Sequence, residues 1–490
     1  MMLLGAVDLG SNSFRVEIGR VDGDRIVTQS YWKETIRMAA GFDKNGAITP
    51  EMQEKALAAL SRFHEKLAGL PADQVRAVGT QALREATNSA EFLPRAEAAL
   101  GYPIGILSGH EEARLVFKGC ARTLPSSDKR RLVVDIGGAS TELIIGHRLD
   151  AKEYESYHVG CVNTSIKFFA DGIITAEKLD KAIVACCAEF SKGEHKFNNS
   201  LFDEAYGSAG TFGAVSDICV AQGWSDGEVT PEHLEKIRAL LLRAGTINNI
   251  QFPGLKPDRR EVIAGGYAVL TAVYRTAGIK SMRPASGALR VGLLYEQLGT
   301  VQNRDTRDIS VDAILRTCGT SREQADIVAG YAVEFLRMLA PGIDPATLKR
   351  LRWAALMHEI GTTISTSRYH RHGEYIVSNA DLPGFTRTDQ QYMATLILSQ
   401  RGGLGKIEEF LKSETNTRQV LAMRLAVIFA HARQAAPLPL ITITRSLNNT
   451  TLNIAIDRVW LENHPLTAYM LQQEADNWKK SGRVITVTTF

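Results

Sequence analysis

One segment of this sequence occurs twice, and that duplication limits the possible folds more than any other feature. Residues 6–19 and 133–146 align without a gap, and each copy contains an apolar run, an aspartate, a glycine-bearing turn and a second apolar run. The two aspartates, Asp8 and Asp135, stand 127 positions apart, which is the length of a domain rather than of a solenoid repeat. The duplication predicts two related α/β halves, each opening with a β-hairpin.

Local signals extend the alternation of strands and helices through the first 300 residues or so. Thr49-Pro50-Glu51 is typical of a helix start, and short apolar runs at 75–79 and 104–107 predict further strands. Beyond Asp305 the pattern becomes mainly helical, because apolar residues within 321–339 recur three and four positions apart.

After Pro437 the pattern changes again. Two alternating runs flank Asn448-Asn449 and predict a β-hairpin with a longer loop, followed by a helix and a last strand. We therefore predict two α/β domains, a helical domain and a small α+β unit. Their predicted bounds are 1–125, 126–304, 305–436 and 437–490.

Composition favours a reduced, globular protein without a membrane span. Among 490 residues, 44% are hydrophobic and 23% are charged, and the formal net charge is only +3. A polyanionic ligand must therefore be held by local basic clusters, and we expect no nucleic-acid partner. The six cysteines lack C-x-x-C spacing, no apolar stretch reaches the length of a membrane helix, and residues 1–7 are too short for a signal peptide. We expect a cytoplasmic protein.

The turn of each repeated hairpin is rich in glycine or serine. Successive backbone N–H groups and hydroxyls in such a turn can bind phosphate, although a single glycine-rich hairpin is usually only a turn. Because both turns follow matching aspartates, we interpret them as two loops that hold one phosphate chain from opposite sides. The candidate phosphate ligands are Ser11, Asn12, Ser13, Gly137, Gly138, Ser140 and Thr141.

Three acidic residues near these loops are candidates for chemistry. Asp135 and Glu142 flank the second turn, and their hard oxygens suit Mg²⁺, which keeps several waters and bridges to phosphate. The alternative for Asp135 is a turn-capping aspartate. Glu112 follows Glu111 in the first turn of a predicted helix, where the helix dipole favours carboxylates whatever their function. A carboxylate at this place could instead orient and deprotonate water.

Further phosphate contacts are predicted from isolated features. Arg84 follows the short strand at 75–79, Gly210 and Thr211 belong to a third loop of small residues, and Arg259 follows a proline turn. A lone arginine is more often a surface charge, and a loop of small residues is more often only a turn. These assignments therefore depend on a family resemblance.

At these positions the sequence resembles the exopolyphosphatase and guanosine pentaphosphate phosphohydrolase family, and the similarity covers nearly the whole chain. The order and spacing of the matching stretches are highly specific. The stretches are Asp8-Leu9-Gly10-Ser11-Asn12-Ser13-Phe14, Gly79-Thr80 with Arg84, Ser108-Gly109 with Glu111-Glu112-Ala113-Arg114-Leu115, Asp135-Ile136-Gly137-Gly138 with Ser140-Thr141-Glu142, Gly210-Thr211, and Ser286-Gly287-Ala288-Leu289-Arg290.

The resemblance implies a duplicated actin-like (ribonuclease H-like) core followed by a helical domain similar to the HD phosphohydrolases. It implies that Glu112 is the base that activates water, that Asp135 and Glu142 are linked to Mg²⁺, and that the chain forms a homodimer. A monovalent cation such as K⁺ is a further candidate ion. The implied phosphate contacts are Asn12, Arg84, Ser140 and Arg259.

The sequence departs from the family pattern at a few positions. Ala139 stands where a third glycine is usual, and its Cβ atom is expected to change the shape of the second loop slightly. Val291 stands where an acid is common. His358-Glu359 stands where an HD motif has His-Asp. With His370, His372 and Asp381 it could form a second metal centre, but we favour a degenerate motif with structural or phosphate-facing histidines.

From these features we expect an exopolyphosphatase, in which Glu112 and Mg²⁺ promote attack of water on the terminal phosphate of polyphosphate. The alternatives are hydrolysis of guanosine pentaphosphate by the same residues, a non-catalytic sensor of polyphosphate or alarmones, and an ATP-dependent kinase of the same fold. We also expect a basic cluster in the helical domain to extend a polyphosphate-binding track. The cluster is Arg368, His370, Arg371 and His372.

Overall fold

The computed structural model describes residues 2–193, 195–301, 305–445 and 451–490. The chain divides into two compact units, Met1–Asp305 and Thr306–Phe490. The predicted loop at Asn448-Asn449 lies outside the described residues. The finer division into four domains stays a prediction.

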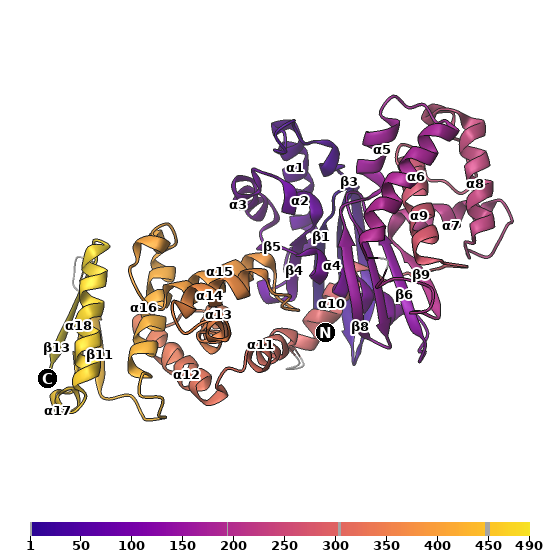
Figure 1. Cartoon of the computed structure of the whole chain (residues 1–490). Coiled ribbons are helices and arrows are strands. Elements are labelled where there is room, and N and C mark those ends of the chain that lie inside the picture. Colours follow the sequence, from indigo (N-terminus) through magenta and orange to yellow (C-terminus); the bar gives the residue numbers. More distant parts are fainter. Residues whose placement is uncertain (1, 194, 302–304, 446–450) are drawn as a thin grey trace. The chain divides into compact units, whose positions relative to one another are not determined.

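Two five-stranded sheets build the first unit (Figure 1). The strands are β1 (Leu3–Leu9), β2 (Ser13–Asp22), β3 (Arg25–Thr35), β4 (Val75–Gly79), β5 (Ile104–Ile106), β6 (Arg130–Ile136), β7 (Thr141–His147), β8 (Asp150–Tyr157), β9 (Glu204–Ser208) and β10 (Arg283–Pro284). The strand orders are β3-β2-β1-β4-β5 and β10-β9-β6-β7-β8, so every strand of one sheet has a counterpart in the other. This matching topology confirms the predicted duplication of an α/β half.

The first unit also contains helices, two of which join its two halves. They are α1 (Pro50–Leu67), α2 (Gln81–Glu85), α3 (Ser89–Leu100), α4 (Gly109–Thr123), α5 (Cys161–Phe169), α6 (Ala176–Phe190), α7 (Ala209–Ala221), α8 (Pro231–Ala244), α9 (Ile263–Ala277) and α10 (Leu289–Val301). Helix α4 packs on β7 and β8, whereas α10 packs on β1 and β2, and the two helices contact each other. A Cβ atom on Gly292 would lie 2.0 Å from the carbonyl oxygen of Leu115, so glycine is what permits this close junction.

The strand register places the repeated aspartates at equivalent points. Asp8 is opposite Arg15 across β1 and β2, and Asp135 is opposite Glu142 across β6 and β7. Strands β4 and β9 run parallel to β1 and β6, so the helices that follow them begin at the same sheet edge as the hairpin turns. The topology thereby gathers the candidate site residues.

The second unit is helical as far as Phe429 and then contains a small sheet. Its elements are α11 (Thr306–Thr317), α12 (Arg322–Leu339), α13 (Pro345–Leu356), α14 (Tyr369–Asn379), α15 (Arg387–Ser399), α16 (Glu414–Phe429), β11 (Ile441–Arg445), β12 (Thr451–Ile456), α17 (Arg458–Glu462), α18 (Pro465–Lys480) and β13 (Val484–Thr489). Phe335, Trp353 and Trp478 belong to one buried core, so the helices and the sheet of order β11-β12-β13 are packed together. The likeness to HD phosphohydrolases stays a prediction.

No helix in the described ranges is both long enough and apolar enough to span a bilayer.

Candidate active site

The turns of the two repeated hairpins meet in the first unit. A Cβ atom on Gly138 would lie 3.0 Å from the backbone nitrogen of Asn12, so the loops touch where a side chain is absent. The carbonyl oxygens of Gly137 and Gly138 accept hydrogen bonds of 3.0 and 2.7 Å from the backbone N–H groups of Cys161 and Val162. The second loop is therefore held in place by the first turn of α5.

A cavity of about 70 Å³ opens where the loops meet. Sites for whole drug-sized ligands usually measure roughly 300–1,000 Å³. This cavity therefore suits a single phosphate group, with the rest of a larger substrate outside it. The predicted residues that line it are Ser11, Asn12, Ser13, Glu112, Asp135, Gly137, Gly138, Ser140, Gly210 and Arg259.

Four predicted residues do not line the cavity. They are Arg84, Thr141, Glu142 and Thr211. The hydroxyl of Thr141 donates a 2.6 Å hydrogen bond to the carbonyl oxygen of Val159, so its proton is not available to a phosphate. Arg84 stands next to the lining instead, with its Nη1 atom 3.4 Å from Oε2 of Glu112. The roles of these four residues stay predictions.

Two arginines line the cavity although they were not among the predicted site residues. Arg15 Nη1 and Arg290 Nη1 lie 3.9 and 3.8 Å from Oδ2 of Asp8. Arg15 Nε and Arg290 Nη1 are buried and have no hydrogen-bond partner among the described residues. Sequence signals for them existed, because Arg15 aligns with Glu142 in the repeat and Arg290 belongs to a family stretch.

The second hairpin brings two buried acids together. The side chains of Asp135 and Glu142 are opposite each other, and the two residues are only 8% and 1% exposed. Burial raises the pKa of Asp135 to about 6, and burial together with the Glu112 and Asp135 carboxylates raises the pKa of Glu142 well above its ordinary value. The first hairpin lacks this repulsion because Arg15 occupies the position equivalent to Glu142.

Adjacent glutamates at the start of α4 have different surroundings. The Glu111 carboxylate pairs with Arg114 at 2.7 Å, and Arg114 pairs with Glu296 of α10 at 2.8 Å, so Glu111 belongs to the helix junction. Glu112 lines the cavity. Burial raises the pKa of Glu112 to about 7, although the nearby Arg84 guanidinium lowers it. Glu112 is therefore poised to exchange a proton near neutral pH.

Arg259 is held against the first turn of α7, which follows β9 directly, so the predicted third loop is helical from Ala209 onward. Arg259 is 8% exposed, and a Cβ atom on Gly210 would lie only 1.6 Å from its Nη2 atom. The preceding Ala209 has φ of 59°, which is uncommon for a residue with a side chain and occurs mainly where surrounding structure imposes it. Gly210 thus leaves the space that the Arg259 guanidinium fills.

Substitution of Gly210 tests this arrangement. Gly210→Ala is expected to displace the end of the flexible Arg259 side chain, raising KM for the phosphorylated substrate about tenfold if one charge-assisted hydrogen bond is lost. Thermal stability should change little, because a side-chain tip can move aside. Gly213→Ala is the matched control, since its Cβ atom meets nothing within 4 Å in the same helix. Identical steady-state kinetics in the two variants would contradict a role for Arg259 in binding.

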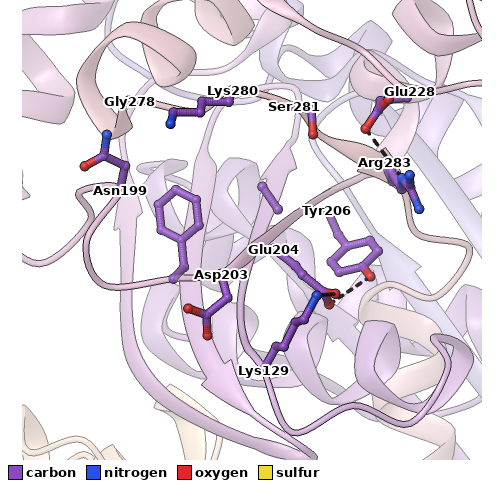
Figure 2. A pocket seen from close by; sticks show the side chains of 12 residues that line it. Lys129, Asn199, Asp203, Glu204, Tyr206, Glu228, Gly278, Lys280, Ser281 and Arg283 are labelled. Atoms are coloured by element: carbon purple, nitrogen blue, oxygen red, sulfur yellow. Dashed lines mark hydrogen bonds and ion pairs between the residues drawn. The ribbon is translucent and has the colours of Figure 1, made fainter.

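A larger hollow of about 610 Å³ lies at the opposite end of β9 (Figure 2). Most of its charged groups are already paired, with Lys129 Nζ 3.1 Å from Glu204 and Arg283 Nε 3.5 Å from Glu228. Such self-compensated pairs give little attraction for an anion. The chemistry therefore belongs to the smaller cavity between the hairpin turns.

Comparison with known proteins agrees with this geometry. Residues 18–301 match the model of the Ppx/GppA phosphatase family, and residues 306–475 match the model of domain III of Ppx/GppA phosphatases. The chain belongs to the Ppx/GppA phosphatase family. The cavity between the hairpins is therefore the candidate active site of a phosphate-ester or phosphoanhydride hydrolase, and the predicted family is confirmed.

Curated relatives within the Ppx/GppA family correct the expected activity. A Vibrio vulnificus (strain YJ016) protein is 36% identical over 97% of this chain and 96% of its own length, and an Aeromonas hydrophila protein is 35% identical over 98% and 97%. Both are named guanosine-5'-triphosphate,3'-diphosphate pyrophosphatase. The expectation of an exopolyphosphatase is therefore wrong. The binding track predicted at Arg368, His370, Arg371 and His372 is not tested. Both substrates end in a terminal phosphate, so residues predicted to hold that phosphate could not discriminate between them.

Solved structures of Ppx/GppA proteins share the fold. An exopolyphosphatase from Cytophaga hutchinsonii matches 61% of this chain and 98% of its own with a TM-score of 0.56 and 21% identity. The Aquifex aeolicus Ppx-GppA enzyme matches 60% and 99% with a TM-score of 0.50 and 22% identity. These likenesses show the actin-like two-domain core.

The acids of this Ppx/GppA site fit a divalent cation that completes its shell with water and substrate. Asp135 Oδ1 and Glu142 Oε2 are buried and have no hydrogen-bond partner among the described residues, and the two carboxylates repel each other. Among the described residues no group of three or more His, Cys, Asp or Glu is arranged to hold a metal alone. Mg²⁺ typically takes one or two carboxylates plus waters and phosphate oxygens, so the donor set is suitable. K⁺, the homodimer and cytoplasmic localisation stay predictions.

Proposed function

We propose that this Ppx/GppA phosphatase removes the terminal 5'-phosphate of guanosine 5'-triphosphate 3'-diphosphate, yielding orthophosphate and guanosine tetraphosphate. The observation that carries the proposal is the name shared by relatives that are 35–36% identical over nearly the whole chain. The size of the cavity is compatible with it, because a terminal phosphate fits inside while the guanosine remains outside.

The residues around the cavity suggest the course of the reaction. Asn12, Ser140 and the loop N–H groups would hold the terminal phosphoryl group, and Arg259 would balance its charge. Glu112 would take a proton from the water that forms the new P–O bond, while the bond to the leaving diphosphate oxygen breaks. Positioning within the closed cavity would supply much of the rate, because phosphoryl transfer needs little covalent help.

Asp135 and Glu142 would hold Mg²⁺ through their unpartnered oxygens. When bound, Mg²⁺ would neutralise charge on the phosphate oxygens and relieve the repulsion between these two carboxylates.

Phosphate release from guanosine pentaphosphate and from long polyphosphate, measured side by side at equal terminal-phosphate concentration, tests the proposal. We expect guanosine pentaphosphate to have the higher kcat/KM. No release from either substrate would favour a sensor, and a requirement for ATP with an acceptor would favour a kinase. Faster release from polyphosphate would overturn the proposal.

The reaction should depend on pH through Glu112. Its pKa is raised to about 7 by burial, and it must be ionised to accept a proton, so kcat/KM should fall as pH drops below about 7. Raising the Mg²⁺ concentration should move this acid limb to lower pH, because a nearby cation stabilises the carboxylate. The check is kcat/KM from pH 5 to 9 at two Mg²⁺ concentrations. A profile that is flat across this range would remove Glu112 as the base.

A further inference from the structure

Two ion pairs connect the two halves of the first unit on either side of Arg259. In the first half, built on β1–β5, Lys33 Nζ lies 2.6 Å from Oδ2 of Asp258, and Arg37 Nη1 lies 2.5 Å from Oε2 of Glu261. The two acids belong to the second half, built on β6–β10, and stand one residue before and two residues after Arg259. The backbone that carries Arg259 is therefore bound from both sides by cations of the other half.

The strand register explains why Lys33 reaches the second half. Lys33 on the edge strand β3 is opposite Arg15 on β2, which is opposite Asp8 on β1. Residues directly opposite on neighbouring strands share a face of the sheet, and Arg15 and Asp8 line the cavity. Lys33 extends that row to the sheet edge, where it meets Asp258. Although burial opposes ionisation of Asp258, Lys33 lowers its pKa, so the carboxylate is ionised at neutral pH.

The second ion pair begins in the segment that supports the first phosphate loop. The backbone N–H group of Arg37 donates a 2.8 Å hydrogen bond to the carbonyl oxygen of Asn12, and that of Ala39 donates to the carbonyl oxygen of Ser11 at 3.2 Å. Arg37 has φ of 61°, which is uncommon for a residue with a side chain and is imposed by its surroundings. The pair between Arg37 and Glu261 thus links the first phosphate loop to the second half.

An apolar contact joins the halves at the same place. Ala39 packs against Cys161, Val162 and Val262, which form a small buried cluster in the second half. Apolar contact holds surfaces together without fixing a direction, whereas an ion pair at hydrogen-bond distance also restricts orientation. The two ion pairs therefore add alignment to a contact that the apolar cluster already stabilises.

We propose that Lys33 and Arg37 are positioning residues, which hold the Arg259 guanidinium where the terminal phosphate binds. This inference rests on the proposed function, because it places that phosphate in the cavity. Neither Lys33 nor Arg37 lines the cavity, whereas Arg259 does, so their effect on the phosphate passes through Arg259. A misplacement of about 1 Å in a binding group is enough to weaken a directional, charge-assisted contact severely.

Steady-state hydrolysis of guanosine pentaphosphate by Lys33→Met and by Arg37→Met tests the positioning role. We expect KM to rise about threefold to tenfold in each variant with kcat close to wild type, because a binding contact is weakened and the base is untouched. Arg62→Met is the matched control, since Arg62 pairs with Glu34 of the same strand β3 at 2.5 Å within the first half. It should leave KM unchanged. An unchanged KM in both Lys33→Met and Arg37→Met would overturn the inference.

The same substitutions in an Arg259→Met background separate positioning from direct contact with the substrate. Because the effect passes through Arg259, Lys33→Met should raise KM much less in this background than in the wild type. An equal rise in both backgrounds would overturn the inference, since Lys33 would then act independently of Arg259.

Hydrogen exchange of the ligand-free, full-length protein gives a readout that needs no substrate. The backbone N–H groups of Arg259 and Val262 donate to carbonyl oxygens within this segment at 3.0 and 3.1 Å, so their exchange reports how firmly it is held. Lys33→Met and Arg37→Met should speed this exchange and Arg62→Met should not; unchanged exchange in all three would overturn the inference. If the wild type releases no phosphate from guanosine pentaphosphate, the proposed function fails, and the exchange comparison still tests how Arg259 is positioned.

Discussion

Glu112→Gln is expected to lower turnover of guanosine pentaphosphate by about 10²–10⁴-fold, which is the usual contribution of a general base. Glutamine keeps the shape of the side chain but cannot accept a proton from water. The phosphate loops are unchanged, so the dissociation constant of the substrate should remain within a few-fold of the wild type. Single-turnover phosphate release and equilibrium binding measure the two effects separately.

Glu111→Gln is the control for position in α4. It removes charge from the ion pair with Arg114, which links α4 to Glu296 of α10. We therefore expect a lower unfolding temperature with turnover close to wild type. The opposite result, a turnover defect in Glu111→Gln and none in Glu112→Gln, would show that Glu111 is the general base.

Glu142→Gln is expected to stabilise the metal-free protein and to remove its response to Mg²⁺. The pKa values of Asp135 and Glu142 are higher in the folded than in the unfolded protein, so ionisation of these groups lowers the free energy of unfolding as pH rises. For Asp135 this loss occurs between pH 3.8 and about 6. For Asp135 that shift corresponds to roughly 3 kcal/mol. The gain from the substitution should therefore be large at pH 7.5 and small at pH 4. Glutamine can still accept the 2.8 Å hydrogen bond from Ser156 Oγ.

Thermal unfolding with and without Mg²⁺ is the measurement for Glu142→Gln. Mg²⁺ should raise the unfolding temperature of the wild type but not of the variant, and hydrolysis by the variant should require much more Mg²⁺. Glu153→Gln on the neighbouring strand β8 is an exposed control and should behave like the wild type. If Mg²⁺ stabilises all three proteins equally, the metal does not bind at Asp135 and Glu142.

The amino-acid sequence alone determined the duplicated core, because a strand, an aspartate, a glycine-bearing turn and a second strand are local features. It also predicted half of the residues that line the cavity, including Asn12, Gly138, Ser140 and Glu112. The activity was not determined in this way, because residues that hold a terminal phosphate do not reveal what the phosphate is attached to. Relatives similar over the whole chain supplied that correction.

Tertiary structure decided which of the neighbouring charged residues belong to the site. Glu111 and Glu112 are adjacent in sequence, yet Glu111 pairs with Arg114 one turn further along α4, and the approach of α10 adds Glu296 to that pair. Glu112 is left at the cavity. Arg290 reaches the cavity for a similar reason, because α10 packs on β1 and β2 far from it in sequence. Such long-range contacts depend on backbone packing permitted by small residues such as Gly292, and no local pattern predicts which distant side chain fills the space.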